Sequence, residues 1–229
     1  MANQPRKQHI VPQLILRNFC ADSTSRIFVF DKSTSKSFTS NPLDAGQQNR
    51  FYNDSGSATP HEMETRLSVL EGVCAPILKK IISTRSLRCL SELEHKILCL
   101  FVSVQYQRTN RTREQLSDVN QNTAVWIKKL GYDPENEVDN FQVLAPEEIK
   151  KISIQLLREL SLGLAVYLTD KKINLLVSEK ESAFLISDNP VNLYNHTPIE
   201  GRGNLGFRNK GIEIFFPISP HVCLSFFLF

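Results

Sequence analysis

The sequence has no long apolar run and no apolar amino terminus. Residues 1–8 are polar, so they lack the apolar core that a signal peptide needs. No uninterrupted apolar stretch is long enough to span a bilayer. We therefore expect a cytoplasmic protein without a membrane partner.

Closely spaced cysteines are also missing. The five cysteines are odd in number and lie mostly among apolar residues, as Cys99 does between Leu98 and Leu100. No pair has the spacing of a zinc ligand set or a redox dithiol, and the five histidines do not cluster near them. We expect reduced core thiols, and structural zinc is disfavoured.

Several motifs of known enzyme classes are absent. There is no glycine-rich phosphate loop and no Gly-x-Ser-x-Gly elbow, and residues 201–203 lack the third glycine of a dinucleotide fingerprint. Nucleotide-fuelled and acyl-transfer chemistry are therefore disfavoured. A net charge of +3, from 27 basic and 24 acidic residues, does not by itself indicate nucleic-acid binding. No helix-turn-helix or zinc finger can be placed.

The chain does have enough apolar residues for one packed domain. Its 229 residues are 41% hydrophobic, which suffices for a proper core. We expect a single α+β domain, 1–229, with a helical middle packed on a mainly antiparallel sheet formed from N- and C-terminal segments. Its parts are an N-terminal hairpin (26–39), a helical core (62–169) and C-terminal strands (172–229). The apolar end, 222–229, predicts either a strand buried to its last residue or a natural chain that continues.

Three long helices are expected in the helical core. Apolar residues at intervals of three and four predict a helix over 62–82, bent at Pro76. A second helix opens at Ser91 with a capping-box match and runs at least to Thr109, beyond which it continues or breaks. A third helix starts at Pro146. The polar stretch 130–143 is expected to be a surface loop.

Strands are expected at both ends of the chain. Phe51 and Tyr52 should anchor an ordered loop over 41–60. Three hairpins are predicted from β-branched and aromatic runs joined by turns: 26–31 with 37–39, 173–177 with 183–187, and 211–216 with 222–229.

The segment Ser187-Asp188-Asn189-Pro190 follows one of these apolar runs and places polar groups at the end of an expected strand. Pro190 pushes Asn189 towards an extended conformation, so the side chains of Asp188 and Asn189 would leave the sheet in fixed directions. This geometry suits a functional site. It equally suits a plain turn, because Asp-Asn-Pro is ordinary turn chemistry.

Arg108 continues the apolar stripe of the second helix, so its guanidinium should be partly buried. A buried charge needs a partner. That partner is either a carboxylate such as Glu71, in a structural salt bridge, or an anionic ligand. Arg111 and Arg113 follow closely, and this group either binds phosphate or is a solvated basic helix end.

Three more residues are candidates for chemistry. His9 suits a general base, a metal ligand or a packing residue. Glu64 and Glu71 lie two turns apart on one helix face, where they would either hold a divalent metal or form ordinary salt bridges at the edge of the core.

The chain also resembles a known family in blocks that span nearly its whole length. The blocks are His9-Ile10-Val11-Pro12-Gln13, Leu16-Arg17-Asn18-Phe19, Gln105-Tyr106-Gln107-Arg108-Thr109, Phe184-Leu185-Ile186-Ser187-Asp188-Asn189-Pro190-Val191 and Phe216-Pro217-Ile218-Ser219-Pro220. In content and order they resemble a bacterial and phage-associated family called domain of unknown function 4238. Ile10 stands where the family commonly has an aromatic residue, and Ile218 where it commonly has leucine.

If these blocks converge in space, they supply groups for handling a phosphodiester. The expected function is a nucleic-acid- or nucleotide-directed hydrolase in a defence or toxin context. Its expected catalytic residues are His9, Asp188 and Asn189, its ligand-binding residues Gln13, Arg17, Gln105, Arg108 and Arg111, and its metal ligands Glu64, Glu71 and Asp188 for Mg²⁺ or Mn²⁺.

Two other readings stay open. The chain can be a non-catalytic binding or interaction protein whose polar cluster is structural, with Arg108 and Asp188 as partners. A terminal edge strand near Phe229 can also pair with another subunit, in a homo-oligomer or with a protein partner.

Overall fold

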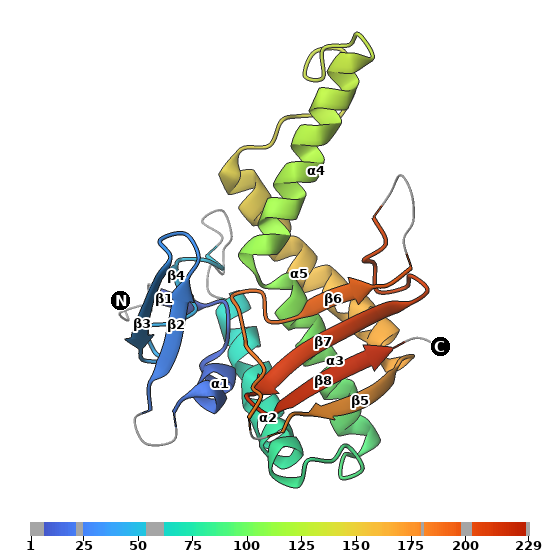
Figure 1. Ribbon diagram of the computed structural model, residues 1–229. Coiled ribbons are helices and arrows are strands. Elements are labelled where there is room, and N and C mark those ends of the chain that lie inside the picture. The colour runs from blue at the N-terminus through green and yellow to red at the C-terminus, as the bar shows by residue number, and fades with distance from the viewer. Residues whose placement is uncertain (1–6, 22–24, 54–61, 180, 198–202, 228–229) are drawn as a thin grey trace.

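The computed structural model describes residues 7–21, 25–53, 62–179, 181–197 and 203–227. The described chain is α+β with antiparallel sheets (Figure 1), which confirms the expected fold class. The helices are α1 (Gln13–Leu16), the 3-10 turn η1 (Arg17–Phe19), α2 (Glu62–Thr84), α3 (Glu92–Gln107), α4 (Asn110–Lys129) and α5 (Pro146–Thr169). The strands are β1 (Lys7–His9), β2 (Ile27–Asp31), β3 (Lys36–Ser40), β4 (Gln47–Asn49), β5 (Lys172–Val177), β6 (Asn192–Asn195), β7 (Ile212–Ser219) and β8 (Val222–Phe227).

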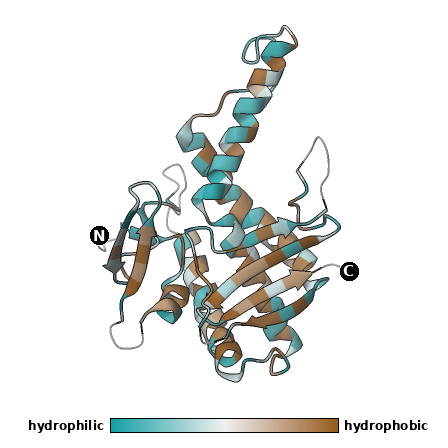
Figure 2. Cartoon of the chain, viewed as in Figure 1, coloured by the Kyte–Doolittle hydropathy of each residue, from teal (hydrophilic) through white to brown (hydrophobic). Residues whose placement is uncertain are grey.

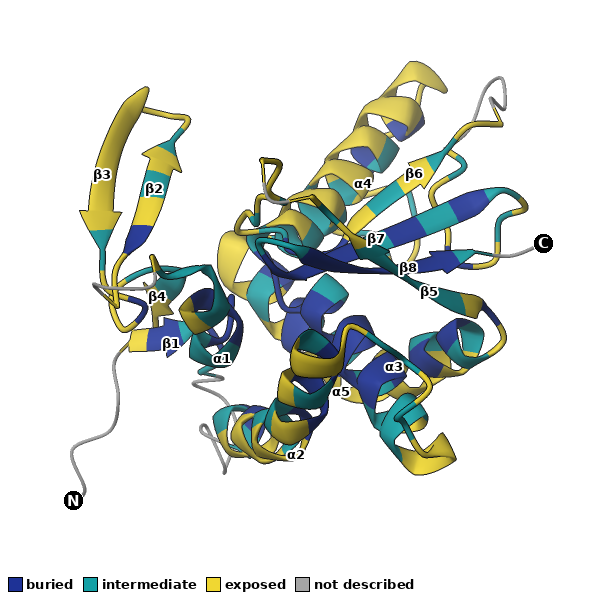
Figure 3. Cartoon of the chain, turned by 60° about the horizontal axis from the view of Figure 1, so that its bottom comes forward, coloured by how far each residue is buried: buried dark blue, intermediate teal, exposed yellow. Residues whose placement is uncertain are grey.

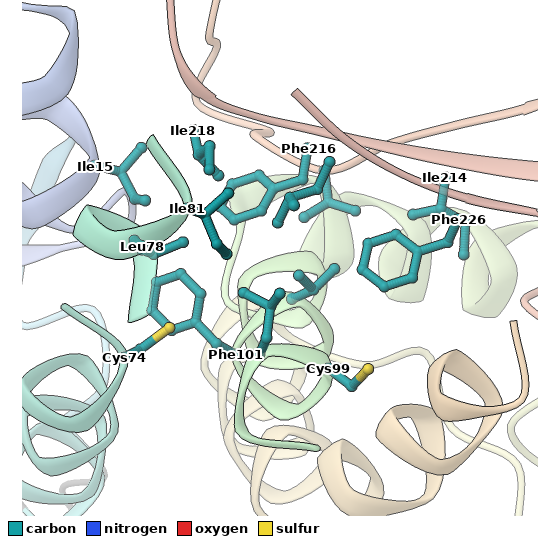
Figure 4. Close-up of a cluster of buried hydrophobic side chains, with 14 of the residues drawn as sticks. Ile15, Cys74, Leu78, Ile81, Cys99, Phe101, Ile214, Phe216, Ile218 and Phe226 are labelled. Atoms are coloured by element: carbon teal, nitrogen blue, oxygen red, sulfur yellow. The ribbon is translucent and has the colours of Figure 1, made fainter. Parts of the chain in front are cut away.

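The main sheet has four antiparallel strands in the order β5-β8-β7-β6. Its long central strands β7 and β8 are apolar in almost every position and are buried along most of their length. Figure 2 shows both strands as largely hydrophobic. The core lies between this sheet and the helices, where Phe216 meets Phe101 of α3 with ring centroids 6.1 Å apart (Figure 4).

Helix α3 is the centre of the helical layer. It packs against α5 and α2, and its middle, from Leu98 to Val104, is almost entirely buried. A helix that is apolar on nearly all sides belongs in a core. Helix α4 differs, since only Ala124 and Ile127 along it are buried, and it extends away from the body of the molecule (Figure 1).

The break between α3 and α4 falls at the predicted arginine. The backbone of Arg108 leaves helical geometry at φ −83° and ψ 34°. Thr109 is extended and begins α4 as its N-cap. The helix predicted from Ser91 to at least Thr109 ends at Gln107, and of the two alternatives beyond it, continuation or a break, the break is the one found.

The amino-terminal strands form two small sheets of their own. β1 pairs with β4 and β2 pairs with β3, both antiparallel. The hairpin over 26–39 is confirmed, and so are the two aromatic anchors, since Phe51 and Tyr52 are both buried. The short strand β4 lies inside the expected loop; part of that loop, 54–60, is outside the described residues.

The predicted hairpin of 173–177 with 183–187 is wrong. Residues 183–187 form no strand, and β5 pairs along its whole length with β8 instead. One backbone bond, from Phe184 N to Pro220 O at 2.7 Å, links this segment to the β7–β8 turn. Apolar content alone cannot show which of two candidate neighbours a strand takes.

The expected edge position of the terminal strand is also wrong. β8 lies between β5 and β7, so its backbone hydrogen bonds are used on both sides and over 222–227 it offers no edge to another subunit. The prediction also included residues 228–229, which are outside the described residues.

Helix α5 is long and apolar enough, by length and composition, to cross a membrane. The core helix of a soluble protein passes the same test. In this fold α5 packs against α3 and buries Ile154, Leu157 and Leu168.

Candidate functional site: the buried Arg108 cluster

Four separate segments meet at the end of α3. They are β1, the segment following β4, helix α2 and the α3–α4 junction. Gln8 of β1 is fully buried and joins two of them, because its Oε1 accepts from the Tyr52 amide at 2.6 Å and its Nε2 donates to Asn53 Oδ1 at 2.9 Å. This bond pair holds Tyr52 in place beneath Arg108.

Arg108 is at the centre of this cluster and is 2% exposed. Its Nη1 is 2.6 Å from Glu71 Oε1, and its Nε donates to Tyr52 Oη at 2.9 Å. Its Nη2 donates to the His9 carbonyl. All three guanidinium nitrogens thus have internal partners, and the salt bridge with Glu71 predicted from the sequence is confirmed. Burial by itself lowers the pKa of Arg108, but Tyr52 and Glu71 outweigh it and raise the pKa above its usual value.

Glu64 lies two turns before Glu71 on α2, and its carboxylate is only partly satisfied. Its Oε2 is buried and has no hydrogen-bond partner among the described residues. Burial raises the pKa of Glu64; Arg108 opposes this shift and Glu71 adds to it. Glu64 therefore holds its proton to a higher pH than an exposed glutamate.

The pKa of the His9 side chain is shifted in the opposite direction. Its Nε2 is 3.2 Å from the Pro42 carbonyl oxygen. Burial lowers the pKa of His9 below 6.5, more than the Pro42 bond and the charge of Glu71 raise it. The imidazole is therefore mainly neutral at neutral pH.

Arg113 belongs to this region, although of the two arginines after Arg108 only Arg111 was among the expected ligand-binding residues. The Arg113 guanidinium lies 3.5 Å from the centroid of the Phe51 ring, and it donates to Phe51 O at 2.6 Å and to Ser153 Oγ at 3.0 Å. Burial lowers its pKa to about 10. Arg111 is exposed and forms an ion pair with Glu114 at 3.5 Å. The sequence signal that could have identified Arg113 is its position, since it lies one helical turn after the buried Thr109 and on the same face.

Gln105 is fully buried, and within the part of the chain that the structure describes neither its Oε1 nor its Nε2 has a hydrogen-bond partner. Two residues later, Gln107 donates from Nε2 to Ser161 Oγ at 2.9 Å and so fastens α3 to α5. The expected ligand residue Gln105 thus lies inside the protein, one turn from Arg108 along α3.

The remaining predicted residues lie near the β7–β8 turn. Gln13 Oε1 accepts from the exposed Arg17 at 3.0 Å. Asn18, on η1, donates to Ile218 O at 3.0 Å, and the segment before Asp188 is bonded to Pro220. The end of β7 and the turn after it are therefore bonded to both η1 and Phe184.

Asp188 is exposed, and the local hydrogen bonds of its segment match the plain turn that was one of the two interpretations. The amide of Asn189 donates to Ser187 Oγ at 3.1 Å, and the same hydroxyl donates to Asn189 O at 2.9 Å. The proposed pairing of Arg108 with Asp188 is wrong, because the carboxylate partner of Arg108 is Glu71.

The expected metal ligands are not assembled. Within the described ranges, no group of three or more histidine, cysteine, aspartate or glutamate side chains is placed to hold a metal ion. Glu71 is held by Arg108, and Glu64, Glu71 and Asp188 do not form such a group. The residues present do not fit the expected Mg²⁺ or Mn²⁺.

Two cavities of different size lie in the molecule, one against the Arg108 cluster and one away from it. The one lined by Tyr52, Arg108 and Arg113 has a free volume of about 10 Å³, which is the size of one water at most. A pocket of about 360 Å³ lies elsewhere, between the α2–α3 connection and β5, lined by Leu90, His95 and neighbouring side chains. The volume against Arg108 is too small for a nucleotide.

Comparison with known proteins gives one match. No curated protein and no solved structure matches the chain. A family model described as "Protein of unknown function (DUF4238)" matches residues 7–228, nearly the whole chain, so this protein belongs to that family.

Proposed function

We propose that the chain is a cytoplasmic binding or interaction protein whose Arg108 cluster is structural. The observation that carries this proposal is that Arg108 is buried and bonded through all three nitrogens to Glu71, Tyr52 and the His9 carbonyl. The cluster fastens β1 and the segment around Tyr52 to helices α2 and α3.

A phosphate could reach this guanidinium only by displacing its present partners. The ion pair with Glu71 is short and its arginine is almost fully desolvated. Removing one partner from such a pair leaves an uncompensated buried charge. The arrangement therefore supports a role in stability rather than in ligand exchange.

Replacing Arg108 tests this role. We expect Arg108→Ala to lower the free energy of unfolding by roughly 3–5 kcal/mol, measured by urea denaturation. Arg111→Ala is the matched control, because Arg111 is exposed and its removal should change stability by less than about 0.5 kcal/mol. Equal stability of Arg108→Ala and wild type would refute the structural role.

The double variant Arg108→Ala/Glu71→Gln distinguishes loss of the Arg108–Glu71 ion pair from destabilisation that each substitution causes by itself. If the two side chains act as one unit, the double variant should be less destabilised than the sum of the two single variants. Strict additivity would mean that the two residues stabilise the fold independently.

A second candidate function is a nucleic-acid- or nucleotide-directed hydrolase in a bacterial defence or toxin setting. The observation that favours it is the pair of opposite pKa shifts, raised at Glu64 and lowered at His9, around the same Glu71–Arg108 pair. Titratable groups shifted in this way are common at sites of acid–base catalysis. In this reading His9 accepts a proton, Glu64 supplies one, and the exposed Arg17 and Asp188 contact substrate.

Turnover of DNA, RNA and nucleotides by the wild type, with and without added Mg²⁺, tests this candidate. We expect His9→Ala, Glu64→Gln and Asp188→Ala to abolish any cleavage while remaining folded. Asp118→Ala, an exposed carboxylate on α4, is the control that should retain it. Cleavage that survives all three active-site changes would reject these residue roles.

A further inference from the structure

The β2–β3 hairpin presents an unusual outer face. It stands apart from the main sheet (Figures 1 and 3). Its inner face contacts the core, because Ile27 is buried and Val29 packs against the core. Between these two residues the strand turns Phe28 outward, and Phe30 follows on the same side; their exposed fractions are 82% and 60%.

The register of the hairpin fixes what surrounds these rings. Phe28 pairs with Thr39 and Phe30 pairs with Ser37, and paired residues point to the same face of a sheet. Two phenylalanines and two hydroxyl side chains therefore share the outer face. The rings are two positions apart on one strand, so they lie about 6.7 Å from one another along it, which leaves room for one flat group on each.

The charge around this face is basic. Arg26 directly precedes β2 and Lys32 directly follows it at the start of the turn, and both are exposed. Lys36 of β3 is also exposed, but it pairs with Asp31 and therefore points to the opposite face, that of Ile27 and Val29. The single acidic residue between positions 25 and 40 is Asp31, and its carboxylate is occupied by Ser33 and Thr34 of the turn.

We propose that this face binds single-stranded nucleic acid. Bases would stack on Phe28 and Phe30, and Arg26 and Lys32 would contact the phosphates. Exposed aromatic rings on a strand, bordered by cations, are the arrangement with which proteins hold unpaired bases. A duplex is a poorer ligand, because its bases are already stacked on one another.

This inference rests on the proposed binding function and names its partner. The proposed structural role of the Arg108 cluster and the proposed binding of nucleic acid can fail separately. The urea test of Arg108→Ala involves no nucleic acid, whereas the test below depends on side chains that contribute little to the core.

The experiment measures fluorescence anisotropy of labelled single-stranded oligo-dT and oligo-rU, with a labelled DNA duplex for comparison. We expect the wild type to bind a single strand more tightly than the duplex, and Phe28→Ala/Phe30→Ala to weaken single-strand binding about tenfold or more. The matched control is Trp126→Ala/Tyr132→Ala, which removes two exposed aromatic rings from the α4 region and should bind as the wild type does.

Two further variants define the kind of contact. Phe28→Tyr/Phe30→Tyr should retain binding and Phe28→Leu/Phe30→Leu should lose it, because only the first keeps rings that stack. Arg26→Gln/Lys32→Gln should make binding less salt-dependent, reducing the slope of log K against log salt by about 1.4 if both residues contact phosphate.

Several results would overturn the proposal. One is wild-type protein that binds neither oligonucleotide at low salt, and another is full binding by the alanine double variant with unchanged unfolding. Equal affinity of the leucine and tyrosine variants would show an apolar contact instead of stacking. A dimer in light scattering that disappears in the alanine variant would assign the face to a second copy of the chain.

Discussion

Glu64 and His9 show how burial, as the largest cause, shifts the pKa values of two ordinary side chains in opposite directions. Desolvation disfavours the charged form of each group, which raises the pKa of the glutamate and lowers that of the histidine. Both groups lie within the electrostatic influence of Glu71 and Arg108. From the sequence, only the residue types and the helical spacing of the two glutamates were visible.

The sign of the Glu64 shift sets a pH dependence of stability. Because its folded-state pKa is raised, the folded protein binds the proton more tightly than the unfolded chain does. The stabilising contribution is fully present below the unfolded pKa of 4.5 and is lost as pH rises through the folded pKa. We expect Glu64→Gln to be more stable than wild type at about pH 7, with the difference shrinking towards about pH 4, as measured by urea unfolding.

Glu114→Gln serves as the control for that measurement, since Glu114 is exposed on α4. Its stability relative to wild type should change little across the same pH range. A Glu64→Gln variant that is less stable than wild type at neutral pH would show that the Glu64 charge is favourable in the fold.

At the scale of elements, signals between near neighbours in the sequence were more reliable than signals for the pairing of distant segments. The capping box predicted at Ser91 is present, with Glu94 N donating to Ser91 Oγ at 3.2 Å and Ser91 N donating to Glu94 Oε2 at 2.7 Å. A cap depends on residues three positions apart. By contrast, the three-residue strands β1 and β4 pair across about forty positions and contain mostly polar residues, so no local pattern marked them.

Removing the cap of α3 should weaken the fold measurably. We expect Ser91→Ala to lower the free energy of unfolding by about 1 kcal/mol, because one amide of the first turn loses its acceptor. Ser68→Ala, at an exposed interior position of α2, should change stability by less than about 0.5 kcal/mol. Thermal or urea unfolding of the two variants measures this difference. Equal losses of unfolding free energy in both variants would show that the cap makes no specific contribution.

At the scale of the whole molecule, stability should be concentrated in the carboxyl-terminal sheet and in α3. β7 and β8 are central in the sheet and are buried on most positions, whereas β2 and β3 form a two-stranded sheet with an exposed outer face. Isolated hairpins are marginally stable in water.

Hydrogen exchange followed by mass spectrometry checks this distribution. We expect peptides from β7, β8 and α3 to exchange most slowly, at rates set by global unfolding, and peptides from β2–β3 to exchange through local opening. Protection of the hairpin equal to that of β7 would show that the amino-terminal unit unfolds only together with the core.

The sequence by itself determined the features that depend on neighbouring residues. These are the α+β class, the long helices with their starts at Ser91 and Pro146, the hairpin over 26–39 and that of 211–216 with 222–229, found as β7 and β8, and the need of the buried Arg108 for a partner. Each follows from periodicity, turn chemistry or the energy of burying a charge within one short segment.

Only the tertiary structure decided which distant segments meet. It pairs β5 with β8 instead of residues 183–187, selects Glu71 instead of Asp188 as the partner of Arg108, and leaves Glu64, Glu71 and Asp188 without a shared metal position. The physical reason is that strand neighbours and ion-pair partners depend on the packing of the entire core. Several segments or carboxylates of the same chemical type could serve, and the packing of the whole chain determines which of them is close enough.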